Sequence, residues 1–278
     1  MSRQEELREF LRSRRARLAP ADVGLETARN GRRVAGLRRE ELAMLAGVSP
    51  DYYARLEQGR AGNVSEQVLD AVAGALRLGA LERDHLIALA KPPVSTDSAA
   101  PRVRPALRSM IAALHPTPAV LHGPRLEVLA INPAAAALIH DFDAMPAAER
   151  NMARWMFCDP AARRVYPDWA DIAQQMVAIL RVAAGRDTQD ARLAELVTEL
   201  CGRSGEFATY WAARRLFEHT YGPKRFHHDR IGDMTLNYET MRLPADPGLS
   251  VILYTADRGS PSEARLNELT RSDKVRAE

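Results

Sequence analysis

The sequence predicts two domains of different fold class: an all-α domain of five helices over residues 1–90 and an α+β domain over residues 105–278. Apolar residues recur at helical spacing through the first part, as in amphipathic helices that share one core. Residues 91–104 combine prolines with small polar residues, a composition typical of an extended linker. Beyond the linker, stretches with strand-like alternation flank a block of helices, which predicts an antiparallel sheet with helices on one face.

The composition is typical of a globular protein of the cytoplasm. The chain of 278 residues is 46% hydrophobic and 27% charged, and it is long enough for two cores. No apolar run approaches the roughly 20 residues of a membrane span, and the N-terminus has no apolar signal-peptide core. Two cysteines, Cys158 and Cys201, are too few for a disulfide framework. We therefore expect a cytoplasmic protein with no membrane partner.

The helices of the first domain follow from their apolar stripes and end signals. In the first helix Leu7, Phe10 and Leu11 face inward, and Pro20 ends it. The segment after Pro20 looks irregular and is rich in arginine. The predicted helices cover residues 3–18, two short segments between Arg38 and Asn63, 65–76 and 81–90.

The stretch from Arg38 to Asn63 reads as two short helices joined by a tight turn. Its first helix has an apolar face formed by residues at helical spacing, Leu42, Leu45 and Ala46. Gly47 can take the positive φ that a sharp turn needs. Ser49 is expected to cap the second helix, with Pro50 at its first position.

The inward residues of this stretch complete a helix-turn-helix pattern. Ala43 provides the small side chain that closely crossing helices need, and Tyr53 and Leu56 form the inward stripe of the second helix. The alternative is an ordinary α-hairpin in a helical core. The spacing resembles the DNA-binding domain of the Cro/C1 (XRE) repressor family, a lambda-repressor-like fold; the residues that carry the resemblance are Arg39, Ala43, Gly47, Val48, Tyr53 and Leu56.

A basic patch accompanies this motif. Such a patch is the electrostatic footprint expected for the phosphate backbone of double-stranded DNA. Away from such a motif, a run of this kind is more often a solvated surface. The clustered arginines are Arg12, Arg14, Arg15, Arg17, Arg29, Arg32, Arg33, Arg38 and Arg39.

The second motif helix is expected to enter the major groove by its N-terminal end. Arg55 is the best candidate to bond O6 and N7 of a guanine, because a guanidinium can reach both. Asp51 either accepts from a cytosine amino group or neutralises the helix N-terminus, and Glu57 is expected to form an intradomain ion pair. The expected DNA contacts are Ser49, Pro50, Asp51, Tyr52 and Arg55 near the bases, and Arg38, Arg39, Arg60 and Asn63 at phosphates.

The second domain begins and ends with strands around a helical block. Alternation of residues from Asp233 to Leu243 predicts a strand with two distinct faces. Ser260 and Glu263 form a predicted capping box at the start of a terminal helix. The expected strands cover residues 118–121, 126–131, 224–229, 233–243 and 249–255; the expected helices cover 107–114, 133–139, 147–157, 168–184, 190–201, 204–219 and 261–270.

Two strands, a block of helices and three strands is the order of a PAS-like domain, which can enclose a small pocket. Three separated blocks, TPAVLHGPRLEVLAINPAAAALI, RNMARWMFCDPAARRVYPDWADIA and KRFHHDRIGDMTLNYETMRLPADPGLSVILYTADRGSPS, resemble the ligand-binding domain of MmyB-like transcription regulators. The resemblance implies a bacterial regulator that joins a DNA-binding domain to a PAS-like sensor. It also implies an operator as partner and a small apolar or amphipathic effector, such as a fatty or aromatic acid.

The candidate ligand-binding residues lie in the helical block and on the strands around it. Arg154 could hold a carboxylate by a bidentate pair, although a surface role is at least as common. The tryptophans could equally be core residues. The candidates are Asn132, Arg154, Trp155, Trp169, Trp211, His227 and Tyr238. Because operators are two-fold symmetric, we also expect a homodimer.

Nothing in the sequence locates an enzyme site. The richest cluster of possible ligands is His219, His227, His228 and Asp229, but neighbouring strand residues point to opposite faces and cannot readily share a metal. The sequence has no HExxH, CxxC or glycine-rich nucleotide loop. We therefore expect no catalysis, no metal and no cofactor. The remaining alternative is a second domain that only dimerises or recruits a protein partner.

Overall fold

A computed structural model describes residues 3–25, 34, 36–61, 64–90, 102–246 and 248–274. The chain divides into two compact units, Met1–Asp97 with Arg181–Ala191 and Ser98–Leu180 with Arg192–Glu278. Most of the expected linker over residues 91–104, and Arg29, Arg32 and Arg33, lie outside the described residues. No described helix is long and apolar enough to cross a membrane.

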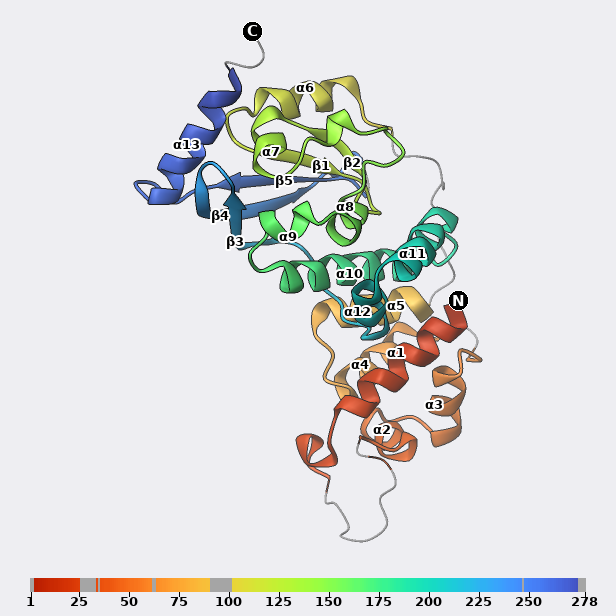
Figure 1. The fold of residues 1–278 in the computed structure, drawn as a ribbon. Coiled ribbons are helices and arrows are strands. Elements are labelled where there is room, and N and C mark those ends of the chain that lie inside the picture. The colour runs from red at the N-terminus through yellow and green to blue at the C-terminus, as the bar shows by residue number, and fades with distance from the viewer. Residues whose placement is uncertain are drawn as a thin grey trace. The chain divides into compact units, whose positions relative to one another are not determined.

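The described residues between 3 and 90 contain the five α-helices that the sequence predicts for the N-terminal domain (Figure 1). A short 3-10 turn after the first helix was not predicted; it is capped by Gly24 with φ 75°. The core joins the predicted apolar stripes, with Leu11, Leu42 and Leu69 fully buried. The elements are α1 (Arg3–Arg17), η1 (Pro20–Val23), α2 (Arg39–Leu45), α3 (Pro50–Glu57), α4 (Glu66–Ala75) and α5 (Ala80–Ala90).

The turn between α2 and α3 has the predicted chemistry. Gly47 has φ 64°, and Ser49 Oγ accepts a hydrogen bond from the Tyr52 backbone N at 3.1 Å. Leu42 is fully buried as expected, whereas Leu45 is 37% exposed and does not join the buried face. The buried face of α2 is centred on Leu42, Ala43 and Ala46, and the rotation of about 100° per helical residue turns Leu45 away from it.

The C-terminal unit contains a five-stranded antiparallel sheet in the order β2-β1-β5-β4-β3. The first hairpin and the last three strands are therefore joined through the centre of the sheet by the β1–β5 pairing. The strands are β1 (Ala119–His122), β2 (Val128–Ile131), β3 (Tyr221–His228), β4 (Gly232–Arg242) and β5 (Ser250–Thr255). The helices are α6 (Pro105–Ala113), α7 (Pro133–Leu138), η2 (Phe142–Ala144), α8 (Met152–Cys158), α9 (Ala161–Val165), α10 (Trp169–Arg186), α11 (Ala191–Arg203), α12 (Gly205–Ala212) and α13 (Pro261–Lys274).

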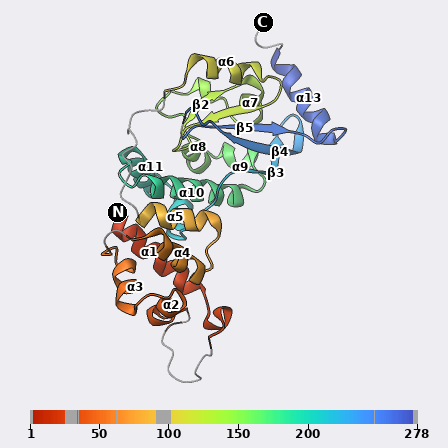
Figure 2. The same cartoon turned by 180° about the vertical axis from the view of Figure 1, so that it is seen from behind.

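Helices cover both faces of this sheet, whereas the sequence predicted helices on one face only. Leu107 and Ile111 of α6 pack on Leu121 and Val251. Tyr166, which follows α9, packs on Phe226 of the opposite face, and α6 and α9 lie on opposite sides of the sheet in both views (Figures 1 and 2). Every residue of β1 is buried, so neither of its faces can be left to solvent.

Several boundaries in the helical block differ from the expectation. The helix α8 starts at Met152 rather than at residue 147, because Asn151 caps it by accepting from the backbone N of Ala153 and Arg154. The expected long helix over residues 204–219 ends at Ala212, and Arg214 has φ 52°, which a helix cannot contain. The extended segment that follows brings His219 alongside the sheet, where its side chain meets Thr240.

Candidate DNA-binding surface and ligand-binding core

The N-terminal end of α3 presents a polar, solvent-accessible surface. Ser49, Pro50 and Asp51 are exposed, while Tyr53 and Leu56 on the other side of the helix are 0% and 1% exposed. The side chain of Arg55 is also exposed, and its guanidinium carbon lies 5.9 Å from the ring centroid of Tyr52. A guanidinium held over an aromatic face is oriented without losing its hydrogen-bond donors to another group.

Glu57 forms the intradomain ion pair that the sequence predicts. Its carboxylate is 1% exposed and accepts from Arg15 Nη2 at 2.8 Å and from Arg39 Nε. The hydrogen bond to Glu57 raises the pKa of Arg39. Arg39 is 49% exposed, so it keeps part of its guanidinium accessible to solvent while one side binds Glu57.

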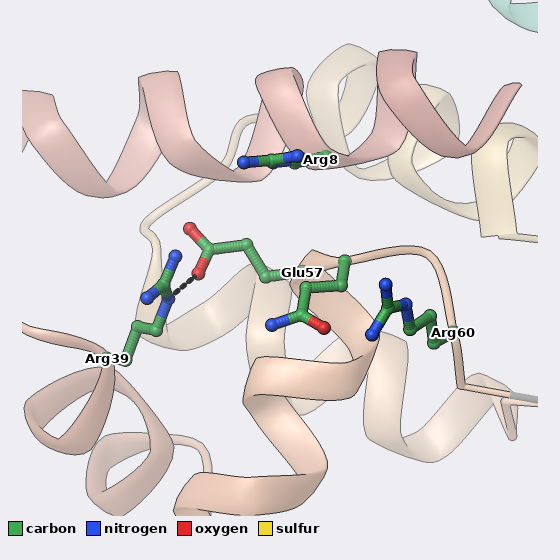
Figure 3. A pocket seen from close by; sticks show the side chains of 5 residues that line it. Arg8, Arg39, Glu57 and Arg60 are labelled. Atoms are coloured by element: carbon green, nitrogen blue, oxygen red, sulfur yellow. Dashed lines mark hydrogen bonds and ion pairs between the residues drawn. The ribbon is translucent and has the colours of Figure 1, made fainter. Parts of the chain in front are cut away.

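A basic surface pocket surrounds this ion pair (Figure 3). It is lined by Arg8, Arg39, Glu57, Gln58 and Arg60, three guanidinium groups against one carboxylate. Figure 3 shows Arg8 on one side of the pocket, on α1, with Arg39 and Arg60 on the other. The arrangement can hold an oxyanion such as a phosphate, because guanidinium forks match its geometry.

The sequence did not single out Arg8 as a site residue. It lies four residues before Arg12, the first member of the arginine cluster, and one helical turn is the spacing that places residues on one side of a helix. Arg38 is exposed at the N-cap of α2. Asn63, the remaining expected phosphate contact, lies outside the described residues.

The face of the C-terminal sheet that packs against Tyr166, called the inner face below, buries a cluster of basic side chains. Lys224 is 7% exposed, and its Nζ lies 3.2 Å from Nε2 of His219. Nδ1 of His219 lies 2.7 Å from Oγ1 of Thr240. His122 on β1 is 3% exposed, and its Nδ1 has no hydrogen-bond partner among the described residues.

Burial weakens the charged forms of all three groups. It lowers the pKa of Lys224 to about 7, of His122 to about 4 and of His219 to about 2. The positive charge of Lys224 lowers the pKa of both histidines further. The cluster therefore contains basic groups that an approaching anion would stabilise in their charged form.

Aromatic rings enclose the Lys224 amine. Its Nζ lies 4.6 Å from the ring centroid of Tyr238, 5.8 Å from that of Tyr254 and 6.0 Å from that of Tyr166. Tyr166 in turn contacts the ring of Trp155 at 5.9 Å between centroids. The indole Nε1 of Trp155 is buried and has no hydrogen-bond partner among the described residues. This core thus joins apolar surface to unsatisfied polar atoms, as ligand sites do.

Comparison with protein families matches each unit. Residues 6–86 match a helix-turn-helix domain, and residues 103–269 match the MmyB-like transcription regulator ligand binding domain. The second match covers more than half of the chain. The chain belongs to the MmyB-like transcription regulators. A comparison with curated proteins found no match.

Both matching families are those of transcription regulators, which agrees with the resemblance seen in the sequence. Among the described residues, no group of three or more His, Cys, Asp or Glu side chains could hold a metal ion. The His227 ring instead lies 2.6 Å from the Asp233 carboxylate and is 41% exposed. Since Phe226 faces inward, the neighbouring His227 lies on the outer face of β3.

In this MmyB-like domain, Arg154 binds a carboxylate of the protein itself. Its Nε and Nη2 donate to Glu199 Oε2 at 2.9 and 2.7 Å, and its Nη1 donates to the carbonyl of Ala148. Hydrogen bonds from Arg154 lower the pKa of Glu199. The sequence predicted a bidentate pair between Arg154 and the carboxylate of a ligand, whereas the partner in the structure is Glu199, which such a ligand would have to displace.

Asn132 is a buried structural cap. Its Oδ1 accepts from the backbone N of Ala119 and of Ala135, each at 3.0 Å, and its Nδ2 donates to the Thr117 carbonyl. It thus fixes the end of β1 to the start of α7. Its location on a strand-to-helix junction is as expected, but its polar atoms are already engaged.

The three tryptophans fall into two aromatic clusters. Trp155 belongs to the inner core with Tyr166. Trp169 contacts Phe157 and donates its Nε1 to the Met156 carbonyl at 3.0 Å. Trp211 stacks on Phe207, which also contacts Phe157. Of the expected ligand residues, Tyr238 lies beside Lys224, and Trp155 joins the same core through its contact with Tyr166. Trp169 and Trp211 belong to the second cluster.

The sequence did not single out Lys224, His219 or His122 for this core. The position of Lys224 could have been noticed in the sequence, because it lies two residues before Phe226 and so points to the same face of the strand. In the structure it pairs with Leu236 on the neighbouring strand. A lysine at an inward position is exceptional in a sheet. His219 had no such signal, since its place depends on where α12 ends.

Proposed function

We propose that this chain is a sequence-specific DNA-binding regulator whose operator binding is controlled by a small apolar or amphipathic ligand in the C-terminal domain. The observation that carries the proposal is the pairing of two sites in one chain. The helix-turn-helix unit has an exposed α3 surface with a basic pocket beside it. The C-terminal unit has a core in which His122 and Trp155 bury polar atoms without hydrogen-bond partners among the described residues.

On the DNA side, α3 reads the bases and the surrounding arginines hold phosphates. Ser49, Pro50, Asp51 and Tyr52 approach the major groove, and Arg55 bonds a guanine edge. Arg38, Arg39, Arg60 and Asn63 are assigned to the backbone, and Arg8 joins them because it lines the same pocket as Arg39 and Arg60. Two copies of this unit are needed to match a two-fold symmetric operator, so the functional species is a homodimer.

On the sensor side, the ligand occupies the inner face of the sheet next to Trp155 and Tyr238. The effector acts by differential binding: it favours one arrangement of the sensor, and that arrangement changes the spacing of the two DNA-binding units. Operator half-sites one helical turn apart impose a spacing of about 34–36 Å, which makes binding sensitive to such a change.

The test is a genome-wide pull-down with the purified full chain and sheared DNA of the source organism. It is repeated after a small-molecule extract of the same cells has been added. The proposal expects a defined set of fragments that share a palindrome, and an occupancy that the extract changes at least several-fold. Fragments that never share a motif would refute the DNA-binding part. Occupancy that no extract changes would favour a C-terminal domain that only dimerises or recruits a protein.

A further inference from the structure

The Lys224 amine is buried without an acidic partner. It is 7% exposed, and no described carboxylate forms an ion pair with it. Among the described residues, its one hydrogen-bond contact is with Nε2 of His219, at 3.2 Å, and histidine is itself a base. A buried ammonium is normally paired with a carboxylate, because desolvation of an isolated charge is strongly unfavourable. The described neighbours of Lys224 leave that role open.

The described titratable groups around Lys224 lie on β1, β4 and β5, before β3 and after α9, and none of them is a carboxylate. They are His219 before β3, His122 on β1, Tyr238 on β4, Tyr254 on β5 and Tyr166 after α9. Burial raises the pKa of Tyr166, Tyr238 and Tyr254, so these phenols stay neutral and cannot serve as counter-ions. Thr240 completes the cluster through its hydrogen bond with His219.

The surroundings of Lys224 also provide aromatic surface. Trp155, Tyr166, Phe226 and Tyr254 form a continuous run of ring contacts, each with centroids 5.3 to 5.9 Å apart. Aromatic rings pair favourably in such edge-to-face and tilted contacts, so an aromatic ligand would be expected to pair with these rings in the same way. The Lys224 amine lies beside this run, 5.8 Å from the ring centroid of Tyr254 and 6.0 Å from that of Tyr166.

We propose that Lys224, together with His219, is the head-group site for an aromatic carboxylic acid, which is bound together with one proton. This assignment rests on the proposed function, since it names the effector class of the same core. The acid supplies the missing carboxylate, and the proton converts the lysine amine into an ammonium. The only bond that forms is the N–H bond that converts the amine into the ammonium, and its proton comes from the buffer, because the ligand is already a carboxylate at pH 6 to 8.

Proton uptake follows from the state of the free site. With its pKa lowered to about 7 by burial, Lys224 is mostly neutral at pH 8 and mostly charged at pH 6. A bound carboxylate restores the ammonium at either pH, because a close opposite charge favours the charged form. Binding at pH 8 must therefore take up about one proton, and binding at pH 6 must take up much less.

The experiment uses the full chain and 4-phenylbutanoate as the probe, with 4-phenylbutan-1-ol as the neutral counterpart. Isothermal titration calorimetry at pH 8 and at pH 6, each in two buffers of different ionisation enthalpy, gives the protons taken up per ligand. The variants are Lys224→Met and, as matched control, Arg225→Met. Arg225 is the next residue on β3, and its 54% exposed side chain pairs with Asp168 at the surface.

We expect 4-phenylbutanoate to bind with uptake of about one proton at pH 8. The Lys224→Met variant should bind it roughly tenfold to hundredfold more weakly, the loss typical of a charged hydrogen bond. Its affinity for 4-phenylbutan-1-ol should not fall, and Arg225→Met should behave as wild type. Thermal unfolding of each variant checks folding; Lys224→Met removes a buried amine and should fold at least as stably as wild type.

Three results would overturn the assignment: no binding of 4-phenylbutanoate by wild type, no proton uptake at pH 8, or equal affinity in Lys224→Met. The wider proposal is judged separately, by operator binding. If cell extract alters operator binding equally in wild type and Lys224→Met, the head-group site is wrong and ligand control stands. If the acid binds through Lys224 but operator binding never responds, the site stands and ligand control is wrong.

Discussion

The carboxylate of Glu57, in the last turn of α3, accepts hydrogen bonds from Arg15 of α1 at 2.8 and 3.3 Å. Arg15 also donates to the Leu37 carbonyl at 2.7 Å, so one guanidinium ties α1 both to α3 and to the segment before α2. These hydrogen bonds hold α3 in position on its buried side, opposite to the residues that it exposes to solvent. It leaves Arg39, the second partner of Glu57, half exposed at the surface.

Glu57→Ala should destabilise the N-terminal unit by about 3 kcal/mol, because removing one partner of a buried ion pair leaves the other charge unpaired. Arg15 is the vulnerable partner, since its side chain is only 13% exposed. Chemical denaturation followed by far-ultraviolet circular dichroism measures the change. Asp70→Ala is the matched control: Asp70 pairs with Arg83 at the surface with both side chains about 40% exposed, and its loss should be within about 1 kcal/mol. A similar loss in both variants would contradict the assigned role of Glu57.

Arg55→Ala should lose discrimination at one base position, with a penalty of about 1–3 kcal/mol confined to the cognate operator. The physical reason is that a bidentate guanidinium contact is specific for one base. Fluorescence anisotropy with the operator and with its single-base variants measures it. Equal losses on operator and random DNA would assign Arg55 to the backbone instead.

Arg8→Ala, Arg39→Ala and Arg60→Ala should each weaken binding to all sequences alike. Each should also lower the slope of log affinity against log salt by about one unit, because one phosphate contact and its released counter-ion are lost. Arg39→Ala should in addition lower stability slightly, since Glu57 loses one of its two partners. Salt titrations with operator and random DNA measure the slopes. An unchanged slope for Arg8→Ala would remove that residue from the DNA surface.

Gly36→Ala should destabilise the N-terminal unit by roughly 2 kcal/mol, as expected for overpacking. An added Cβ would lie 2.6 Å from Cα of Ala16 and 2.6 Å from the carbonyl oxygen of Arg15, and backbone atoms cannot give way as a flexible side chain can. Gly74→Ala is the control, because its Cβ would meet nothing within 4 Å and alanine favours the helix α4 by about 0.5–1 kcal/mol. Thermal unfolding should therefore move in opposite directions for the two variants.

The pH dependence of stability should report Lys224. Its pKa is lowered from 10.5 to about 7 in the folded protein, so between these values the unfolded chain binds the extra proton. The free energy of unfolding should then rise with pH across this range, by up to about 1.4 kcal/mol per unit. In Lys224→Met this rise should disappear. Denaturation followed by tryptophan fluorescence isolates the relevant unit, because all three tryptophans lie in it; parallel pH profiles for the two proteins would show that Lys224 keeps its ordinary pKa.

Much of the fold could be predicted because it depends on local signals. Ser49 caps its helix where the sequence places it, and Gly47 takes the positive φ of the turn. The alternation along β4 correctly gave its two faces, with Met234, Leu236 and Tyr238 buried. Predictions failed where a helix boundary depends on tertiary packing. The helix α12 ends at Ala212, although no proline or glycine follows there to mark the end. The end is visible only in the structure, where the next segment packs along the sheet.

The candidate sites divide in the same way. The sequence by itself determined the helix-turn-helix, the residues on the exposed surface of α3 and the family, because periodicity, caps and motif spacing are carried by consecutive residues. Only the tertiary structure decided which charges are already neutralised. Arg154 and Glu199 are 45 residues apart, and so are not paired by any local pattern. Lys224, His219 and His122 become one buried basic cluster only when β1, β3 and β4 share a sheet, because burial and proximity, and hence the pKa of each group, are properties of the folded chain.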